Sequence, residues 1–535
     1  MSGIRAGCIT CEFRAVPFNA AARRRESLQW LAVATLWCGL LGLFVRAFIW
    51  SEAWGMSDDV YISAGAARSL WDGFGPVWFP EAPPVEGFSN PLWVGVLALL
   101  HGLPGFSEDR LGGLVFGVNL VLLIALAGAS VRVLRGVVGG GWTLLLFAPA
   151  AAALPYFAAE GFEVVLVALC ALLAVDAAWR REPLRFAVWV AIGFWTRMDF
   201  LALAALPALV LLWRTRGDPR VPRSIALGAF LVGLQFVLRW GFFGEWLPNT
   251  VYLKGVGWPI GDRALQGVAQ NAWAVPTVLA AVAVGVWGVR ASGPSAGARA
   301  GLGALAIGTF AVAFGYSTFM GGDFLGRRVG WDRFTAPALP LLVVGLSASL
   351  SSLSLRRGPR YALSWLVLLA LLVPAIATSS DRKLLARRLF SAGEAVELQA
   401  WVRSWRRYGK AVREVSWPGA RLATCSAGAV VYFSGRGGVD LLGKVDPFVA
   451  RLPVGEPAGE SRCWRDWPGH NKEAFAETFA LRRPELSAVA PPHALRRDYR
   501  PVRYEGLELW VDRTSPLVRW DVLRLAPGWP EGGVP

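Results

Sequence analysis

Apolar runs long enough to cross a membrane recur through the first 380 residues of this 535-residue chain. A helix needs about 20 apolar residues to span the hydrocarbon core of a bilayer. The chain is 55% hydrophobic with a mean hydropathy of +0.44, values that soluble domains rarely reach. We predict about eleven spans, at residues 28–50, 111–131, 141–158, 160–178, 184–197, 200–213, 224–243, 272–290, 300–320, 334–353 and 361–379.

Arginines cluster before the first run and then at alternate loops, at Arg23, Arg132, Arg180, Arg214, Arg290 and Arg356 and their neighbours. Because basic residues are retained in cytoplasmic loops, we place the N-terminus in the cytoplasm and the C-terminal region outside. This orientation requires that the short apolar segment 91–102 does not cross fully. The alternative, a full crossing there, places Arg132 and Arg180 on the outer side.

The character of the chain changes at residue 381, where long apolar runs stop and charges appear every few positions. We therefore expect a cytoplasmic segment at 1–27, a transmembrane domain at 28–380 with its first outer loop at 51–90, and a soluble extracytoplasmic α/β domain at 381–535. The net charge of +16 is shared between the membrane part and the soluble tail, and the retention of basic residues in cytoplasmic loops explains the membrane share better than nucleic-acid binding does, so no nucleic-acid partner is expected. Cys425 and Cys463 fall in the exported tail and form either a disulfide or two buried thiols.

Charged residues also gather on the predicted outer face. Asp58 and Asp59 follow the first apolar run, and Arg197 and Asp199 stand between two spans. Lys254 is the only lysine in the first 380 residues. Charges next to membrane spans usually face a functional cavity. The alternatives are a solvated helix end for the two aspartates, a buried structural pair for Arg197 and Asp199, and a surface lysine.

Carboxylates and cations at one membrane face suit inverting glycosyl transfer. A carboxylate removes the proton of an acceptor hydroxyl. Cationic side chains stabilise the phosphate that leaves. Hydrolysis or transport could use similar charges, and the pattern alone does not separate them.

The first outer loop carries a specific block, Asp58-Asp59-Val60-Tyr61-Ile62-Ser63, which closes with Val85-Glu86-Gly87-Phe88-Ser89-Asn90-Pro91-Leu92-Trp93. Further motifs follow in order: Gly161-Phe162-Glu163, Thr196-Arg197-Met198-Asp199, Leu247-Pro248-Asn249-Thr250 with Lys254, Gly321-Gly322-Asp323, Arg333-Phe334, Asp440-Leu441-Leu442-Gly443, and Pro468-Gly469-His470 with Lys472. This series resembles GT-C-fold polytopic membrane glycosyltransferases, in the branch of bacterial cell-wall terminal β-arabinofuranosyltransferases. Arg197-Met198-Asp199 departs from the branch, which has proline at its centre.

The resemblance implies a GT-C-like helical membrane protein with a polyprenyl-phosphate sugar as donor and a cell-envelope glycan or glycolipid as acceptor. It implies a catalytic aspartate in the first outer loop, with Asp58 the preferred base and Asp59 a base or an orienting partner. Candidates for the donor phosphate are Arg197, Lys254 and Arg333. Candidates for sugar binding or for shaping the site are Glu86, Asn90, Glu163, Asp199, Asn249, Asp323, His470 and Lys472.

We accordingly expect a bacterial inner-membrane enzyme that moves a sugar, such as the pentofuranose arabinofuranose, on the outer face. A glycolipid transporter or flippase, or a non-catalytic protein of envelope assembly, is the alternative. No cofactor is required and no metal site is expected, because Cys8 and Cys11 lack the further ligands that zinc needs. A divalent cation on the carboxylates stays open, since carboxylates bind such ions.

Overall fold

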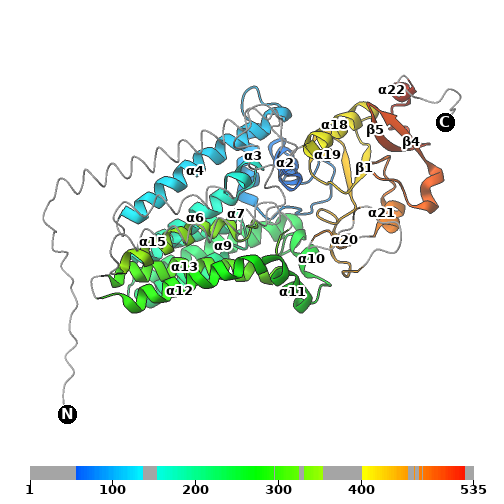
Figure 1. Ribbon diagram of the computed structural model, residues 1–535. Coiled ribbons are helices and arrows are strands. Elements are labelled where there is room, and N and C mark those ends of the chain that lie inside the picture. The colour runs from blue at the N-terminus through cyan, green and yellow to red at the C-terminus, as the bar shows by residue number, and fades with distance from the viewer. Residues whose placement is uncertain are drawn as a thin grey trace, which may run out of the picture.

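The computed structural model describes residues 56–135, 154–293, 296–323, 331–353, 400–455, 463, 469–472 and 474–524, without the side chains of 135 and 400–403. Its two parts are a helical part, 56–353, and a C-terminal unit, 400–524 (Figure 1). The helices of the first are α2 Asp58–Trp71, α3 Pro91–His101, α4 Leu111–Arg135, α6 Val164–Arg180, α7 Pro183–Thr196, α8 Phe200–Arg214, α9 Arg220–Phe243, α10 Asn249–Gly255, α11 Ile260–Asn271, α12 Val275–Ala291, α13 Gly297–Phe319 and α15 Leu339–Ser352.

Four stretches of described helix are long and apolar enough to cross a membrane: Glu108–Leu134, Arg220–Phe243, Ile260–Ala291 and Gly297–Phe319. They coincide with the predicted spans at 111–131, 224–243, 272–290 and 300–320. The spans predicted at 184–197, 200–213 and 334–353 fall on shorter apolar helices. The predicted segments 1–27, 28–50 and 361–379, and most of 141–158, lie outside the described residues, so the number of spans stays a prediction.

The predicted span at 160–178 begins too early, because a turn precedes α6. Gly161 has a φ of +85°, a conformation that glycine adopts without strain. The helix itself begins only at Val164. The segment 91–102 forms the 11-residue helix α3, with Pro91 at its first position. At 1.5 Å per residue, α3 covers only about half of the roughly 30 Å hydrocarbon core.

Charges are sorted between the two ends of the helical part. Glu163 precedes α6, Arg197 follows α7 and Asp199 precedes α8, all at the end that faces the C-terminal unit. The opposite ends of the helices carry arginines in the last turns of α4, α6, α8 and α12 and in the first turns of α7, α9 and α13. The helix directions therefore agree with the alternation of charge in the sequence. Which end faces the cytoplasm stays a prediction.

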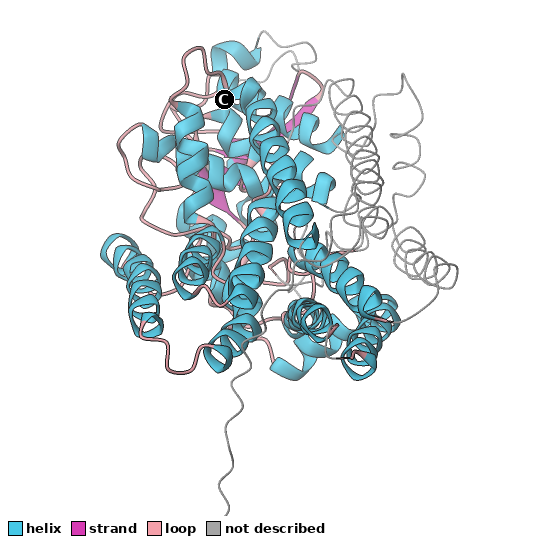
Figure 2. Cartoon of the chain, turned by 90° about the vertical axis from the view of Figure 1, so that its left-hand side faces the viewer, coloured by secondary structure: helices cyan, strands magenta, loops and turns pink. Residues whose placement is uncertain are grey.

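The C-terminal unit is built on a five-stranded sheet of order β2-β1-β3-β5-β4. Strands β1 Arg421–Thr424, β2 Gly437–Asp440 and β3 Leu486–Ser487 are parallel, and the hairpin of β4 Tyr499–Tyr504 and β5 Leu507–Asp512 continues the sheet antiparallel. Its helices are α18 Ala400–Val415, α19 Ala429–Ser434, α20 Pro447–Ala450, α21 Phe475–Arg482 and α22 Trp520–Arg524. In the view from the helical end, the sheet lies beyond the helices (Figure 2).

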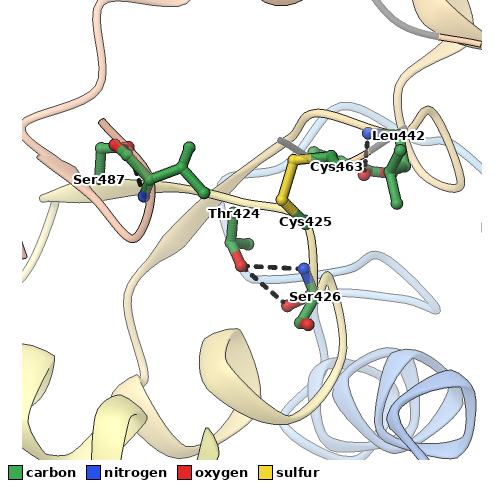
Figure 3. Close-up of a disulfide and its surroundings, with 8 residues drawn as sticks. Thr424, Cys425, Ser426, Leu442, Cys463 and Ser487 are labelled. Atoms are coloured by element: carbon green, nitrogen blue, oxygen red, sulfur yellow. Dashed lines mark hydrogen bonds between the residues drawn. A yellow bond between two sulfur atoms is a disulfide. The ribbon is translucent and has the colours of Figure 1, made fainter. Parts of the chain in front are cut away.

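A disulfide joins Cys425, which directly follows β1, to Cys463 (Figure 3). The sequence left this pairing open, and the structure contains the bond. It closes a loop across 38 positions of sequence, which limits the conformations of the unfolded chain. The loop after β1 is further held by the side chain of Thr424, whose hydroxyl accepts a hydrogen bond of 3.0 Å from the amide of Ser426.

Helix α19 of the C-terminal unit packs into the apolar core of the helical part. Tyr432 and Phe433 of α19 are buried among residues of the helical part. The ring of Tyr61 in α2 lies 5.3 Å from that of Tyr432 and 5.2 Å from that of Phe433. The indole of Trp78 donates a 2.9 Å hydrogen bond to the carbonyl of Ala427. The loops at the carboxyl ends of β1 and β2 therefore lie against the first loop of the helical part.

Candidate functional site

A cavity of about 170 Å³ lies where the helix ends meet the C-terminal unit. We call it the pocket. Four basic and four acidic side chains line it, together with apolar and neutral polar groups. The charged ones are Asp59, Glu163, Asp199, Asp323, Arg197, Lys254, Arg333 and Lys444. A cavity with convergent charges of both signs is suited to a ligand that joins an anionic group to polar groups.

Asp59 is held by two cations in the pocket. One carboxylate oxygen lies 3.0 Å from the guanidinium of Arg333, and the other lies 2.5 Å from the ammonium of Lys444. Burial pushes the pKa of Asp59 upward, but the charges of Lys444 and Arg333 outweigh burial and hold the pKa well below its usual value. Arg333 also contacts Asp323, at 2.6 Å. Asp59 is therefore ionised and paired in this structure.

Asp58 has a different environment from its neighbour. Its carboxylate accepts hydrogen bonds from the backbone amides of Ala429, at 2.8 Å, and Gly428, at 3.3 Å. Asp58 is buried and does not line the pocket. Burial raises the pKa of Asp58 to about 6, although Lys444 and the two amides oppose the shift. The two adjacent aspartates are thus separated: Asp58 joins α2 to the C-terminal unit, and Asp59 faces the pocket.

A hydrogen-bonded chain of polar side chains forms one wall. The amide of Asn90 donates to Glu163 at 3.0 Å, and the guanidinium of Arg197 contacts Glu163 at 3.4 Å and Asp199 at 2.5 Å. Glu163 and Asp199 lie at helix N-termini, and Arg197 lies at a helix C-terminus. Each charge therefore complements the dipole of its helix. Because α6, α7 and α8 begin or end at these residues, the three charged groups lie together at the helix ends that face the C-terminal unit.

Lys254 differs from the other three cations of the pocket. Arg197, Arg333 and Lys444 each have a carboxylate within ion-pair distance, whereas within the described ranges Lys254 has none. Its ammonium lies 5.5 Å from the ring centre of Phe334. Burial and the nearby charge of Arg333 lower the pKa of Lys254 to about 8. This lysine can therefore neutralise an incoming anion.

The structure brings together most of the residues that the sequence singled out. Those that line the pocket are Asp59, Asn90, Glu163, Arg197, Asp199, Lys254, Asp323, Arg333 and His470. Four others surround it. Besides Asp58, they are Glu86, paired with Arg239 of α9; Asn249, bonded to the loop after β2; and Lys472, bonded to the carbonyls of Ala450 and Tyr252. The contacts of these four residues hold the segments that carry the residues lining the pocket.

Sequence reasoning missed Lys444. The sequence motif ended one residue earlier, at Gly443, and the lysine looked like one basic residue among many in the tail. Its position in the sequence could have identified it, because Lys444 directly follows a glycine turn at the end of the parallel strand β2. Ligands of α/β sheets bind outside the carboxyl ends of such strands.

Within the part of the chain that the structure describes, no cluster of three or more histidine, cysteine or acidic residues has the spacing to hold a metal ion. The acidic groups that line the pocket are each paired with a cation instead.

No family model matches the chain, and no curated protein matches it. Two solved structures are similar to it, both of ArnT from Cupriavidus metallidurans. The one bound to undecaprenyl phosphate has 14% sequence identity and a TM-score of 0.47, covering 90% of this chain and 99% of that chain. The apo one has 14% identity and a TM-score of 0.49, covering 89% and 98%. At these values neither likeness says what this chain binds.

Proposed function

We propose that this protein is an inverting glycosyltransferase that moves a sugar from a polyprenyl-phosphate donor to a cell-envelope glycan, on the outer face of a bacterial inner membrane. One observation carries the proposal: the pocket presents an aspartate, and a lysine that has no carboxylate partner among the described residues, to the same small cavity at the ends of apolar helices. A donor with a lipid tail can keep the tail in the bilayer while its phosphate and sugar enter such a cavity.

Three charged groups of the pocket act in the proposed transfer. Asp59 accepts the proton of the acceptor hydroxyl as that oxygen bonds to the anomeric carbon. The bond from the anomeric carbon to the phosphate oxygen breaks, and the phosphate leaves with the electron pair. Lys254, helped by Arg333, stabilises the charge that develops on the phosphate. Attack opposite to the leaving phosphate inverts the configuration of the anomeric carbon.

The wall of Asn90, Glu163, Arg197 and Asp199 is proposed to hold the donor sugar. These groups offer both donors and acceptors of hydrogen bonds, as sugar hydroxyls require. His470, from the C-terminal unit, lines the same cavity and is proposed to contact the acceptor. The resemblance of the first loop to arabinofuranosyltransferases favours a pentofuranose as the transferred sugar.

The test is transfer by the purified protein in nanodiscs. A labelled polyprenyl-phosphate pentofuranose and an envelope-glycan fragment are supplied, and the product is analysed for its linkage and anomeric configuration. We expect inverted product from the lipid donor and none from the corresponding nucleotide sugar. Movement of glycolipid across vesicles without any transfer would instead identify a transporter. Linkage analysis of the envelope glycan from a deletion strain then names the missing sugar.

A further inference from the structure

The ion pairs of Asp59 conflict with its proposed role as the general base. A carboxylate that neutralises both Arg333 and Lys444 is a weak base, because a proton must displace two favourable interactions. Efficient general bases have pKa values near the working pH. Some event must therefore weaken the pairing before Asp59 can accept a proton.

Lys444 is the partner that an incoming anion can remove. Arg333 is also paired with Asp323, at 2.6 Å, so its charge is shared between two carboxylates. Lys444 has Asp59 as its one carboxylate partner among the described residues. Its side chain is 12% exposed, and it lines the cavity that Lys254 also lines. An anion placed beside Lys254 therefore competes with Asp59 for Lys444.

The loop that carries Lys444 is fixed from both sides. The carboxylate of Asp440 accepts hydrogen bonds from the amides of Leu442, at 2.9 Å, and Val445, at 2.7 Å. The side-chain amide of Asn249, in the helical part, donates to the carbonyls of Gly443 and Lys444, at 2.9 and 3.1 Å. The backbone is thus held by both parts of the molecule. Exchange of ion-pair partners then needs only rotation of the lysine side chain.

We propose that Lys444 exchanges partners: the phosphate of the donor takes its ammonium from Asp59, and binding of the donor thereby frees the carboxylate to accept the acceptor's proton. This inference rests on the proposed function, because the phosphate is that of the lipid donor. It makes the base active only when a donor is in place. The C-terminal unit then contributes a cation, Lys444, to the reaction and does not only cover the pocket.

Binding of decaprenyl phosphate to the protein in nanodiscs tests the exchange without any turnover. Asp59→Asn removes the competing carboxylate, so we expect this variant to bind the lipid phosphate about tenfold more tightly than the wild type. In a Lys444→Met background the same substitution should lose most of that gain, because the shared cation is absent. Lys444→Arg should restore it.

Asp109→Asn is the matched control. Asp109 is also paired with one arginine and one lysine of the C-terminal unit, Arg406 and Lys410, but it lies outside the pocket. Its substitution should leave the affinity unchanged. Binding by Asp59→Asn that equals or falls below the wild type overturns the inference, as does a gain that persists without Lys444. Failure of the wild type and of Asp59→Asn alike to bind the lipid overturns the proposed function as well.

A second measurement does not depend on the folding of Asp59→Asn. In Lys444→Met the carboxylate of Asp59 loses one of its two cations, so its pKa rises toward the usual range of an aspartate, and kcat/KM should fall more steeply with decreasing pH than it does in the wild type. A uniform loss of activity, with the shape of the pH profile unchanged, would show that Lys444 only binds the phosphate. That outcome contradicts the exchange and leaves the proposed function intact.

Discussion

Ion pairs join the helical part and the C-terminal unit at several places, and two carboxylates among them have similar partners but different surroundings. At the Asp109 interface, Asp109 holds Arg406 and Lys410 at 2.8 and 2.9 Å, and its side chain is 43% exposed. In the pocket, Asp59 holds Arg333 and Lys444 at 3.0 and 2.5 Å, and its side chain is 26% exposed. Each carboxylate thus has one arginine and one lysine partner. The second set lines the pocket, and the first set does not.

The difference shows what separates a structural ion pair from a site. Exposed pairs such as those of Asp109 contribute about 0–1 kcal/mol each and serve to orient two surfaces. The groups of the pocket are shielded from solvent, and their charges interact more strongly there. The pocket also contains Lys254, and no carboxylate among the described residues lies within ion-pair distance of its ammonium.

Among changes to the cations, Lys254→Met should have the largest effect. It removes the cation that is available for the donor phosphate, and we expect kcat/KM for the donor to fall about a hundredfold, as for the loss of one group that stabilises a leaving charge. Steady-state transfer assays in nanodiscs measure this. Lys410→Met is the reference, because it removes a lysine of the Asp109 interface, and it should stay within about twofold of the wild type. Equal losses in the two variants would contradict the comparison.

The pH dependence of kcat/KM should reflect the ionisation of the same lysine, Lys254. The pKa of Lys254 is lowered to about 8, so the ammonium is present below that pH and is lost as the pH rises through it. The phosphodiester of the donor does not titrate there. We expect kcat/KM to fall about tenfold per pH unit above about 8. In Lys254→Arg the basic limb should move beyond the measurable range, because arginine keeps its charge. An unmoved limb would assign the fall to another group.

Gly428→Ala should have the smallest effect on the chemistry and a clear effect on stability. A Cβ atom at Gly428 would lie 1.8 Å from the carbonyl oxygen of Asp58, so backbone must shift where α2 meets the C-terminal unit. Overpacking of this kind costs about 1–3 kcal/mol. Thermal unfolding in detergent measures the change. Gly95→Ala in α3 is the control, because nothing lies within 4 Å of the added atom, and it should not lower the melting temperature.

The helices were the more predictable part of this fold. Apolar runs such as 224–243 and 300–320 coincide with long helices because the same residues that a bilayer requires also form continuous helix. Two helix ends were predictable from charge, since Arg197 and Asp199 break otherwise apolar sequence, whereas Glu163 falls inside the span predicted at 160–178. The strands β1 and β2 are four residues each, too short for a reliable periodic pattern.

The site was predictable only to the level of single residues in separate loops. The first-loop motif indicated an aspartate pair, but a sequence cannot show which of two adjacent side chains faces a cavity. That depends on Gly428 and Ala429, some 370 positions away, whose amides bind Asp58. Lys444 was missed for the same reason, because its partner Asp59 comes from the other part of the chain. Contacts between distant segments decide these roles.

The most direct test of the central claim compares the two adjacent aspartates in one transfer assay. If Asp59 is the carboxylate that meets the substrate, Asp59→Asn should lower kcat by roughly 10²–10⁴-fold. Asp58→Asn should mainly lower the melting temperature, and Asp109→Asn should leave kcat unchanged. The contrary result is a transferase that keeps its full rate in Asp59→Asn and loses it in Asp58→Asn. The base would then be Asp58, as the sequence predicted, and the pocket would not be the site of proton transfer.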